Sequence, residues 1–497
     1  MGMTDYVLAI DQGTTSTKTS LIDPSLNVVA SAGYELPQIF PRPGWVEHDP
    51  DTILRTTFDS IKAVLQKANI DPHRIAVIGI TNQRETAIVW DRKTGRPVYN
   101  AIVWQCKRTN HIVEKLRDRG YEKAFKNATG LVLDPYFSAT KIMWLINTIP
   151  GLRTKAQKGE IAFGTVDSWL LWHLTGGASH ATDVSNASRT LLFNIKRLKW
   201  DDDLLKITGI PRYIMPEVRP TADIFGYTRE LGFLPDNIPI GALAGDQQSA
   251  LFGQACFEAG TVKATYGTGS FVLFNTSDRP IMSGHGLLTT IAWQIKNRVT
   301  YALEGSAMIS GAAVQWARDG LGIISRSEDI EALASSVPDS GGVVFVPSLS
   351  GLGAPFWRPD AKGIITGITR GTVKAHIARA ILEGIALQEH TLLEAMKEDT
   401  GQRISALKVD GGASKDNLLM QFQADILGIP VVRPQNIETT SLGAAMLAGL
   451  YAGIWRDVKE LRKIWKEDRR FNPTMPVAQR RGFLSRWNAA VKKLLVE

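Results

Sequence analysis

Residues 6–22 read YVLAIDQGTTSTKTSLI, and residues 261–274 read TVKATYGTGSFVLF. Each stretch places two strand-like runs around a turn of glycine and hydroxyl residues, and Gly267 stands in the second stretch where Gly13 stands in the first. The two turns are separated by just over half of the 497-residue chain. This repeat predicts two halves of related fold, with a boundary near residues 250–258.

Strand-like and helical patterns alternate along the whole chain, which is typical of an α/β protein. The apolar runs expected to form strands are 6–10, 75–80, 238–244, 343–347 and 406–410. The amphipathic stretches expected to form helices are 52–69, 138–148, 374–397 and 417–427. Together with the repeat, this pattern predicts one domain over residues 1–253 and a second over 254–497.

Composition excludes several classes of protein. The chain is 44% hydrophobic and 21% charged, as in ordinary globular proteins, and it has no run of ~18 apolar residues that would suggest stable membrane insertion. Residues 1–6 show no basic and apolar leader. Cys106 and Cys256 lie too far apart in the sequence to suggest a disulfide framework or a zinc cluster, and we expect both to be buried. These features favour the cytoplasm.

The net charge of +8 arises partly near the C-terminus, in residues 457–470 and 479–493. Apolar residues recur at helical spacing between those charges, so we expect two amphipathic helices. No groove-reading motif or aromatic stacking pattern accompanies the charge, and we therefore expect no nucleic-acid partner.

The two glycine-hydroxyl turns are candidate phosphate sites, because such a tip presents backbone N–H groups and hydroxyls without side-chain bulk. Either turn alone could be a plain hairpin tip. A P-loop and a dinucleotide-binding fingerprint are both missing from the sequence. A third element, residues 406–428, has a strand, then Gly411-Gly412, then a helix, and it could accept a flat ring or a ribose.

Several longer motifs carry a resemblance to a known family. The motifs are 11–16 (DQGTTS), 82–85 (NQRE), 101–106 (AIVWQC), 133–138 (LDPYFS), 244–248 (AGDQQ), 267–269 (GTG), 347–357 (PSLSGLGAPFW), 411–412 (GG) and 438–445 (ETTSLGAA). The chain resembles, over nearly its whole length, the carbohydrate kinases of the actin and sugar-kinase ATPase superfamily, and among them the glycerol kinases. The resemblance implies two ribonuclease-H-like (actin-like ATPase) domains related by an internal duplication, with a cleft between them.

A small polyol offers only hydroxyl and C–H groups, so its site needs a forked donor, a charged acceptor and an apolar wall. Arg84 and Glu85 could supply the donor and the acceptor, and Trp104, Tyr136 and Phe271 could supply the wall and a phenolic hydroxyl. Without the resemblance, a surface ion pair and core aromatic residues would explain the same side chains. The resemblance favours the substrate site and adds to it two neighbouring residues, Asp246 and Gln247.

Asp246 follows an apolar strand and opens a predicted helix, so by itself it could be a helix N-cap. The resemblance implies instead a catalytic base that accepts the proton of the attacking hydroxyl. Asp11, at the end of the strand 6–10, would be the second carboxylate near Mg²⁺. Two carboxylates without a histidine cage suit Mg²⁺, which keeps several waters and also binds phosphates.

The resemblance also implies a set of ATP contacts. Those near the phosphates are Thr14, Thr15, Ser16, Lys18, Thr268, Gly311 and Gln315, and those near the adenosine are Gly412 and Asp416. Two positions depart from the family pattern. Lys18 replaces the usual arginine, which substitutes a point charge for a bidentate fork. Residues 414–416 lack the asparagine common there, which leaves the role of Asp416 open.

The expected activity is ATP-dependent phosphorylation of glycerol to sn-glycerol 3-phosphate, by a homo-oligomer. One alternative is a kinase for another polyol or sugar. Another is a nucleotide-switched binding protein on the actin-like scaffold, since a fold does not fix a function. The polyol residues argue against this second alternative, because such a protein needs no polyol site.

Some bacterial members of the family are inhibited by fructose 1,6-bisphosphate, or activated by histidine phosphorylation, in the region before the strand that leads to the catalytic aspartate. The matching residues here, 226–240, contain no histidine and a single arginine, Arg229, with Glu230 and Asp236 nearby. Without a histidine the segment has no residue to be phosphorylated, and the two carboxylates would repel a bisphosphate. We therefore expect neither control.

Overall fold

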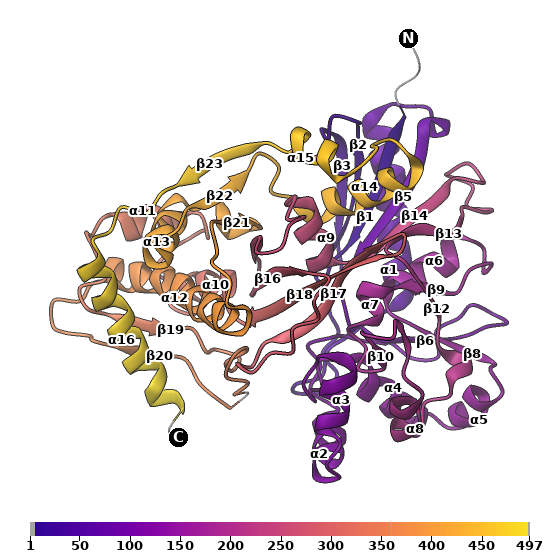
Figure 1. Cartoon of the computed structure of the whole chain (residues 1–497), viewed down its shortest axis with the longest axis horizontal. Helices are drawn as coiled ribbons and strands as arrows, with labels where there is room; N and C mark the ends of the chain where they lie inside the picture. Colours follow the sequence, from indigo (N-terminus) through magenta and orange to yellow (C-terminus); the bar gives the residue numbers. More distant parts are fainter. Residues whose placement is uncertain (1–4, 359, 496–497) are drawn as a thin grey trace.

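The structure is a computed structural model that describes residues 5–358 and 360–495. Residues 1–4, on which the expectation of no leader partly rests, lie outside the described residues. A 13-stranded mixed sheet runs through both halves of the molecule (Figure 1). Its strands, in spatial order, are β23 (Glu467–Phe471), β22 (Val431–Pro434), β21 (Leu407–Asp410), β15 (Val262–Tyr266), β16 (Ser270–Ser277), β18 (Arg298–Ala307), β17 (Leu288–Ile295), β13 (Ala222–Tyr227), β14 (Pro239–Gly245), β5 (Ile75–Asn82), β1 (Tyr6–Gln12), β2 (Ser16–Ile22) and β3 (Val28–Glu35).

The strand pairing repeats between the halves. In the first half, β1 and β3 pair antiparallel with β2, and β5 pairs parallel with both β1 and β14. In the second half, β15 and β18 pair antiparallel with β16, and β21 pairs parallel with both β15 and β22. The turns with Gly13 and Gly267 occupy the same place in the two units. The predicted duplicated α/β fold is therefore confirmed.

The strand pairing of the sheet is weakest where the two halves join. There β13 and β17 pair through a single residue couple, Ala222 with Ile295, although β13 is also bound to β14 and β17 to β18. So few ladder hydrogen bonds cannot by themselves hold the halves together, and helices complete the junction.

The helices of the first half begin with α1, which packs against β3, β2 and β1. Most of the others belong to a long insertion between β5 and β14, residues 83–238, which also contains short strands and the main-sheet strand β13. The helices are α1 (Pro50–Ala68), α2 (Asn110–Asp118), α3 (Glu122–Thr129), α4 (Ser138–Thr148), α5 (Leu152–Gln157), α6 (Val166–Leu174), α7 (Val184–Ala187), α8 (Asp202–Thr208) and α9 (Asp246–Gly253). The short strands are β4 (Glu47–His48), β6 (Ile88–Asp91), β7 (Ala101–Ile102), β8 (Ile161–Gly164), β9 (Ala181–Asp183), β10 (Phe193–Asn194), β11 (Lys199–Trp200) and β12 (Glu217–Arg219).

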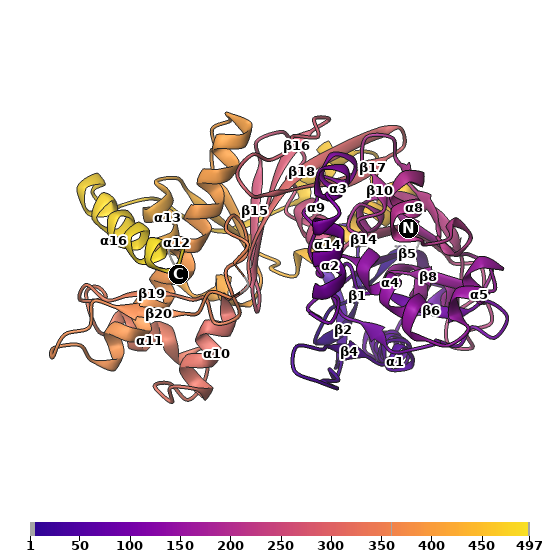
Figure 2. The same cartoon turned by 90° about the horizontal axis from the view of Figure 1, so that it is seen from below.

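The second half has its own helical layer. In Figure 2, α12, α13 and α16 lie side by side at the end of the molecule farthest from the insertion. The helices are α10 (Gly311–Asp319), α11 (Asp329–Ser335), α12 (Lys374–Thr400), α13 (Asn417–Leu427), α14 (Thr439–Ala452), α15 (Val458–Ile464) and α16 (Val477–Leu495). A small ladder of β19 (Val344–Val346) and β20 (Ile364–Thr366) completes this half.

One helix of each half reaches across the junction. α14 packs against β1, β5 and β14 of the first half, so the yellow ribbon lies beside the indigo strands in Figure 1, and α9 packs against β15 and β17 of the second. The two helices touch each other closely. A Cβ on Gly443 would lie 1.8 Å from the Ser249 carbonyl oxygen, and one on Gly253 would lie 2.0 Å from that of Thr439. Only glycine permits this approach.

The C-terminal prediction was partly wrong. Residues 479–493 lie in the helix α16, as expected, but residues 457–470 form only the short helix α15 followed by the strand β23. β23 pairs antiparallel with β22, whose outer edge would otherwise leave its backbone groups unpaired. This pairing outweighs the local helical pattern, and exposed basic residues suit an edge strand.

The cysteines and the helices of the described residues bear on two further expectations, the burial of both thiols and the lack of a membrane-spanning segment. Cys106 and Cys256 are free and buried, as expected. Among the described residues, no helix is both long and apolar enough to span a membrane.

Candidate functional site

A cavity of about 210 Å³ opens where the strands β1, β5 and β14 end, and it faces the second glycine-hydroxyl turn. The carboxyl ends of parallel strands meet at one edge of an α/β sheet, which is where such folds bind ligands. The lining residues are Thr14, Thr15, Gln38, Arg84, Glu85, Trp104, Gln105, Tyr136, Asp246, Gln247, Thr265, Gly267, Thr268, Gly269, Phe271 and Met308.

Every residue predicted to bind the polyol lines this cavity: Arg84, Glu85, Trp104, Tyr136, Asp246, Gln247 and Phe271. Three of them form its aromatic wall. The Trp104 ring forms T-shaped contacts with Tyr136, at a centroid distance of 5.5 Å, and with Phe271, at 6.3 Å. Trp104 Nε1 donates to Thr14 Oγ1 at 2.9 Å, which joins this wall to the first glycine-hydroxyl turn.

Arg84 is buried and its guanidinium is engaged on three sides. Nη1 and Nη2 donate to the carboxylate of Glu304 at 2.5 and 3.0 Å, Nη1 also donates to Gln248, and Nε lies 3.0 Å from Asp246 Oδ1. Among the described residues, these contacts leave one N–H of the guanidinium without a protein partner. The forked donor expected to face the substrate is therefore turned toward Glu304, and Arg84 has a single N–H to offer a ligand.

Glu85 is held from behind by a second buried arginine. Arg189 Nε donates to Glu85 Oε1 at 2.6 Å, and Glu85 adopts a left-handed backbone conformation with φ of 61°. Such a conformation is uncommon outside glycine and is often found at functional sites. It turns the chain sharply after β5 and brings the side chains of Arg84 and Glu85 to the same cavity.

Asp246 is the first residue of α9, and the N-cap is Gly245. Its Oδ1 accepts a hydrogen bond from the backbone N–H of the next residue, Gln247, at 2.6 Å. The side chain is 27% exposed, so a ligand in the cavity can reach the carboxylate. Burial raises the pKa of Asp246, and the positive charge of Arg84 opposes this rise.

Asp11 lies near the end of β1, close to Asp246. Burial, together with the carboxylates of Asp246 and Glu438, raises the pKa of Asp11 to about 7. Among the described residues, no three His, Cys, Asp or Glu side chains form a metal-binding group. Two neighbouring carboxylates that repel each other are nevertheless a suitable donor set for Mg²⁺, which takes one or two carboxylates together with phosphate oxygens.

The two glycine-hydroxyl turns approach the cavity from opposite halves. The first contributes Thr14 and Thr15. The second contributes the run 267–269, whose backbone is fixed by the start of α10: the N–H of Gly311 donates to the Gly267 carbonyl at 2.9 Å. The cavity therefore has hydroxyls and backbone groups on both sides, as a polyphosphate requires.

The other predicted nucleotide residues do not line this cavity. Ser16 opens β2, Lys18 Nζ lies 3.0 Å from Glu438 Oε1, and Gln315 is exposed on α10. Gly412 is exposed in a 3₁₀ turn after β21. Asp416 is the N-cap of α13, because its Oδ1 accepts from the backbone N–H of Leu419 at 2.8 Å.

Sequence reasoning missed the buried residues behind the cavity. Glu304, Arg189 and Lys263 are 0% exposed, and each contacts a residue that lines the cavity. A signal for two of them is present, because Glu304 and Lys263 interrupt strand-like apolar runs. A buried charge in a central strand needs a partner of opposite charge.

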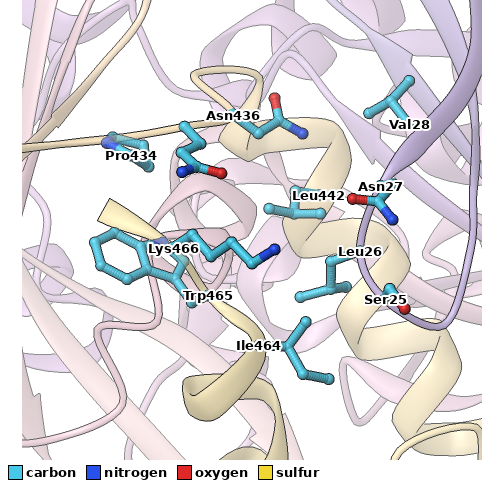
Figure 3. A pocket seen from close by; sticks show the side chains of 11 residues that line it. Ser25, Leu26, Asn27, Val28, Pro434, Asn436, Leu442, Ile464, Trp465 and Lys466 are labelled. Carbon is cyan, nitrogen blue, oxygen red and sulfur yellow. The ribbon is translucent and has the colours of Figure 1, made fainter. Parts of the chain in front are cut away.

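A second cavity, of about 390 Å³, lies between the β2–β3 turn and the segments around α14 and α15 (Figure 3). Its walls include Leu26, Leu442, Ile464 and Trp465, and the Lys466 side chain extends into it. None of the described residues that line it is an aspartate, glutamate, histidine or cysteine. It therefore offers no carboxylate to accept a proton from a hydroxyl or to bind Mg²⁺, and the smaller cavity is the candidate active site.

Comparison with known proteins places the chain in a family. Residues 6–253 match the N-terminal domain, and residues 262–452 the C-terminal domain, of the FGGY family of carbohydrate kinases. The chain is 55% identical over 490 residues to a protein from Thermotoga maritima named glycerol kinase 2, covering 99% of both chains. It is 56% identical over 491 residues to glycerol kinase 1 of Saccharolobus solfataricus, covering 99% of this chain and 97% of that one.

A solved structure agrees with these matches. The crystal structure of Plasmodium falciparum glycerol kinase with ADP superposes with a TM-score of 0.92 at 38% identity, covering 99% of each chain. A xylulose kinase from Lactobacillus acidophilus, 24% identical with a TM-score of 0.88 and coverage of 98% and 97%, shares the fold. On the full-length identity and the two matched domains, this chain belongs to the FGGY family of carbohydrate kinases.

Proposed function

We propose that this protein is a glycerol kinase, which transfers the γ-phosphoryl group of ATP to glycerol and forms sn-glycerol 3-phosphate. The observation that carries the proposal is the cavity of about 210 Å³, with glycine-hydroxyl turns from both halves and with Arg84, Glu85 and Asp246 in its wall. Relatives of this chain over its full length are named glycerol kinases.

Glycerol would bind against the aromatic wall formed by Trp104, Tyr136 and Phe271. Its C–H groups pack on the rings, while Glu85 accepts hydrogen bonds from its hydroxyls. The remaining N–H of Arg84 and the amide of Gln247 donate to the hydroxyl oxygens.

Asp246 would act as the general base. It accepts the proton of the attacking hydroxyl while that oxygen bonds to the γ-phosphorus, and the bond from this phosphorus to the bridging oxygen breaks to release ADP. A bound Mg²⁺ would neutralise charge on the phosphate oxygens, with Asp11 and Asp246 as its protein ligands. The hydroxyls and N–H groups of the two turns hold the phosphates in line with the substrate.

The ATP site would lie in the cleft between a domain over residues 1–253 and a second over 254–497. Thr14, Thr15, Ser16, Lys18, Thr268, Gly311 and Gln315 are the proposed phosphate contacts, and Gly412 and Asp416 the proposed adenosine contacts. The ranges matched to the two family domains, 6–253 and 262–452, support this division. The cytoplasmic location and the homo-oligomeric state stay predictions.

The experiment that tests the proposal is an assay of ADP release with Mg-ATP and a panel of acceptors. We expect release with glycerol to exceed release with D-xylulose, erythritol or water alone by at least about 10², because the site's polar groups are left unpaired by a misfitting acceptor. Preferential phosphorylation of another polyol or sugar would favour the first alternative. ATP binding with no acceptor-dependent turnover would favour the nucleotide-switched binding protein.

A further inference from the structure

Glu304 sits on β18, in the second half of the chain, and its side chain is fully buried. It accepts hydrogen bonds from Arg84 Nη1 and Nη2 at 2.5 and 3.0 Å, and from Arg189 Nη2 at 2.9 Å. Both arginines come from the first half, from the end of β5 and from the segment after α7. Glu304 does not line the cavity but lies directly behind it.

These contacts extend into a chain of alternating charges: Asp246, Arg84, Glu304, Arg189 and Glu85. Each arginine lies between two carboxylates, and the two ends of the chain, Asp246 and Glu85, face the cavity. Of the five residues, Glu304 alone belongs to the second half. Of the three carboxylates among these five described residues, only that of Glu304 hydrogen-bonds to both arginines, because Glu85 Oε1 bonds to Arg189 but lies 4.0 Å from Arg84 Nε.

The physical consequence concerns the two arginines. Without the negative charge of Glu304, Arg84 and Arg189 would be buried cations that repel each other, and they would have to share the charges of Asp246 and Glu85. Arg84 would then be free to shift toward Asp246, and Arg189 would lose the contact that fixes its orientation toward Glu85. Asp246 and Glu85, the carboxylates at the two ends of this row of charges, would therefore move.

We propose that Glu304 is a positioning residue of the polyol site, which holds Arg84 directly and Glu85 through Arg189 in the places where they meet the substrate hydroxyls. The inference rests on the proposed function. It also means that the polyol site is not built by the first half alone, because the carboxylate that orders it comes from β18.

The test uses the full-length protein and the variants Glu304→Gln, Glu304→Asp and Arg189→Lys. Removing one partner of a buried charge pair typically costs enough to lower kcat/KM for glycerol by about 10²-fold. We expect this loss in Glu304→Gln, carried mainly by a higher KM for glycerol, with the KM for ATP changed by less than about twofold. Glu304→Asp keeps the charge and should recover part of the loss. Arg189→Lys should raise the KM for glycerol as well.

The matched control is Glu47→Gln. Glu47 is also a buried glutamate paired with a buried arginine, Arg108, at 2.6 Å, but neither residue lines the cavity. This variant should unfold at lower urea concentration while keeping both KM values. If Glu304 had a merely structural role, Glu304→Gln would behave like this control: it would unfold at lower urea concentration with an unchanged KM for glycerol.

A double-mutant cycle with Arg84→Ala gives a second measurement. If Glu304 acts through Arg84, the two changes should be far from additive in kcat/KM for glycerol. Additive losses, or equal rises of the glycerol and ATP KM values, would overturn the inference while leaving the proposed function intact. Absence of glycerol-dependent ADP release by the wild-type protein would overturn both. If Glu304→Gln fails to fold, Glu304→Asp and Arg189→Lys decide by the same KM criterion.

Discussion

Lys263 Nζ lies 2.5 Å from Gln247 Oε1, although the lysine is on β15 of the second half and the glutamine is on α9. A lysine ammonium can only donate hydrogen bonds, so the oxygen of the amide must face it. The amide nitrogen of Gln247 is thereby directed away from Lys263. This contact fixes the glutamine as a hydrogen-bond donor beside Asp246.

Lys263→Met should therefore weaken glycerol binding. Without the ammonium, the Gln247 amide can rotate and the donor is no longer held, which we expect to raise the KM for glycerol by about tenfold, in line with the loss of one charged hydrogen bond. Steady-state kinetics with glycerol varied at saturating ATP measure it. In a Gln247→Ala background the same lysine substitution should add little, and an undiminished effect there would contradict this explanation.

Asp246→Asn tests the base. The amide keeps the size of the side chain and most of its hydrogen bonding but cannot accept the proton, so we expect kcat to fall by roughly 10²–10⁴. Calorimetry should show that glycerol still binds. A variant that keeps more than about a tenth of the wild-type kcat would exclude Asp246 as the general base.

Arg84→Ala removes the guanidinium that separates Asp246 from Glu304. The carboxylates of Asp246 and Glu304 are left without their shared cation, and we expect a loss of about 2–4 kcal/mol in kcat/KM for glycerol. Nucleotide affinity, measured by ADP titration, should hardly change. Equal losses for glycerol and nucleotide would indicate a structural ion pair instead.

Gly443→Ala tests the contact between α9 and α14. A Cβ at this position would meet the Ser249 carbonyl at 1.8 Å, so the two helices must move apart, and we expect the free energy of unfolding to fall by about 1–3 kcal/mol. Urea unfolding measures the change. Gly482→Ala, in the helix α16 with its nearest neighbour at 3.5 Å, is the control and should be neutral or slightly stabilising. Equal changes in the free energy of unfolding for the two variants would show that α9 and α14 can move apart without cost.

Fructose 1,6-bisphosphate should not inhibit the enzyme through residues 226–240. Arg229 is exposed and lies 3.2 Å from Glu230, while Asp236 accepts a hydrogen bond from the Glu230 backbone, so the one cation of this loop is already paired with a carboxylate. An ADP-release assay with millimolar effector at fixed Mg²⁺ checks this. Loss of more than half of the activity, relieved by Arg229→Ala, would identify the loop as an effector site.

The sequence alone predicted the duplicated fold and most of the cavity wall. Gly13 and Gly267 mark turns that follow apolar strands, and such local patterns form with little help from distant residues. Arg84, Glu85 and Asp246 directly follow strand-like runs, so their meeting at one sheet edge follows from the parallel arrangement of those strands. The roles of the individual cavity residues remain predictions.

Other features depend on tertiary structure, because no local sequence pattern encodes them. Residues 467–471 form a strand only because β22 offers an open edge across the fold. The partners of Glu304 lie 220 and 115 positions away in the sequence, and a charge in an apolar strand does not reveal which distant cation will neutralise it. Packing the two halves together brings these groups into one low-dielectric interior, where only compensated charges are stable.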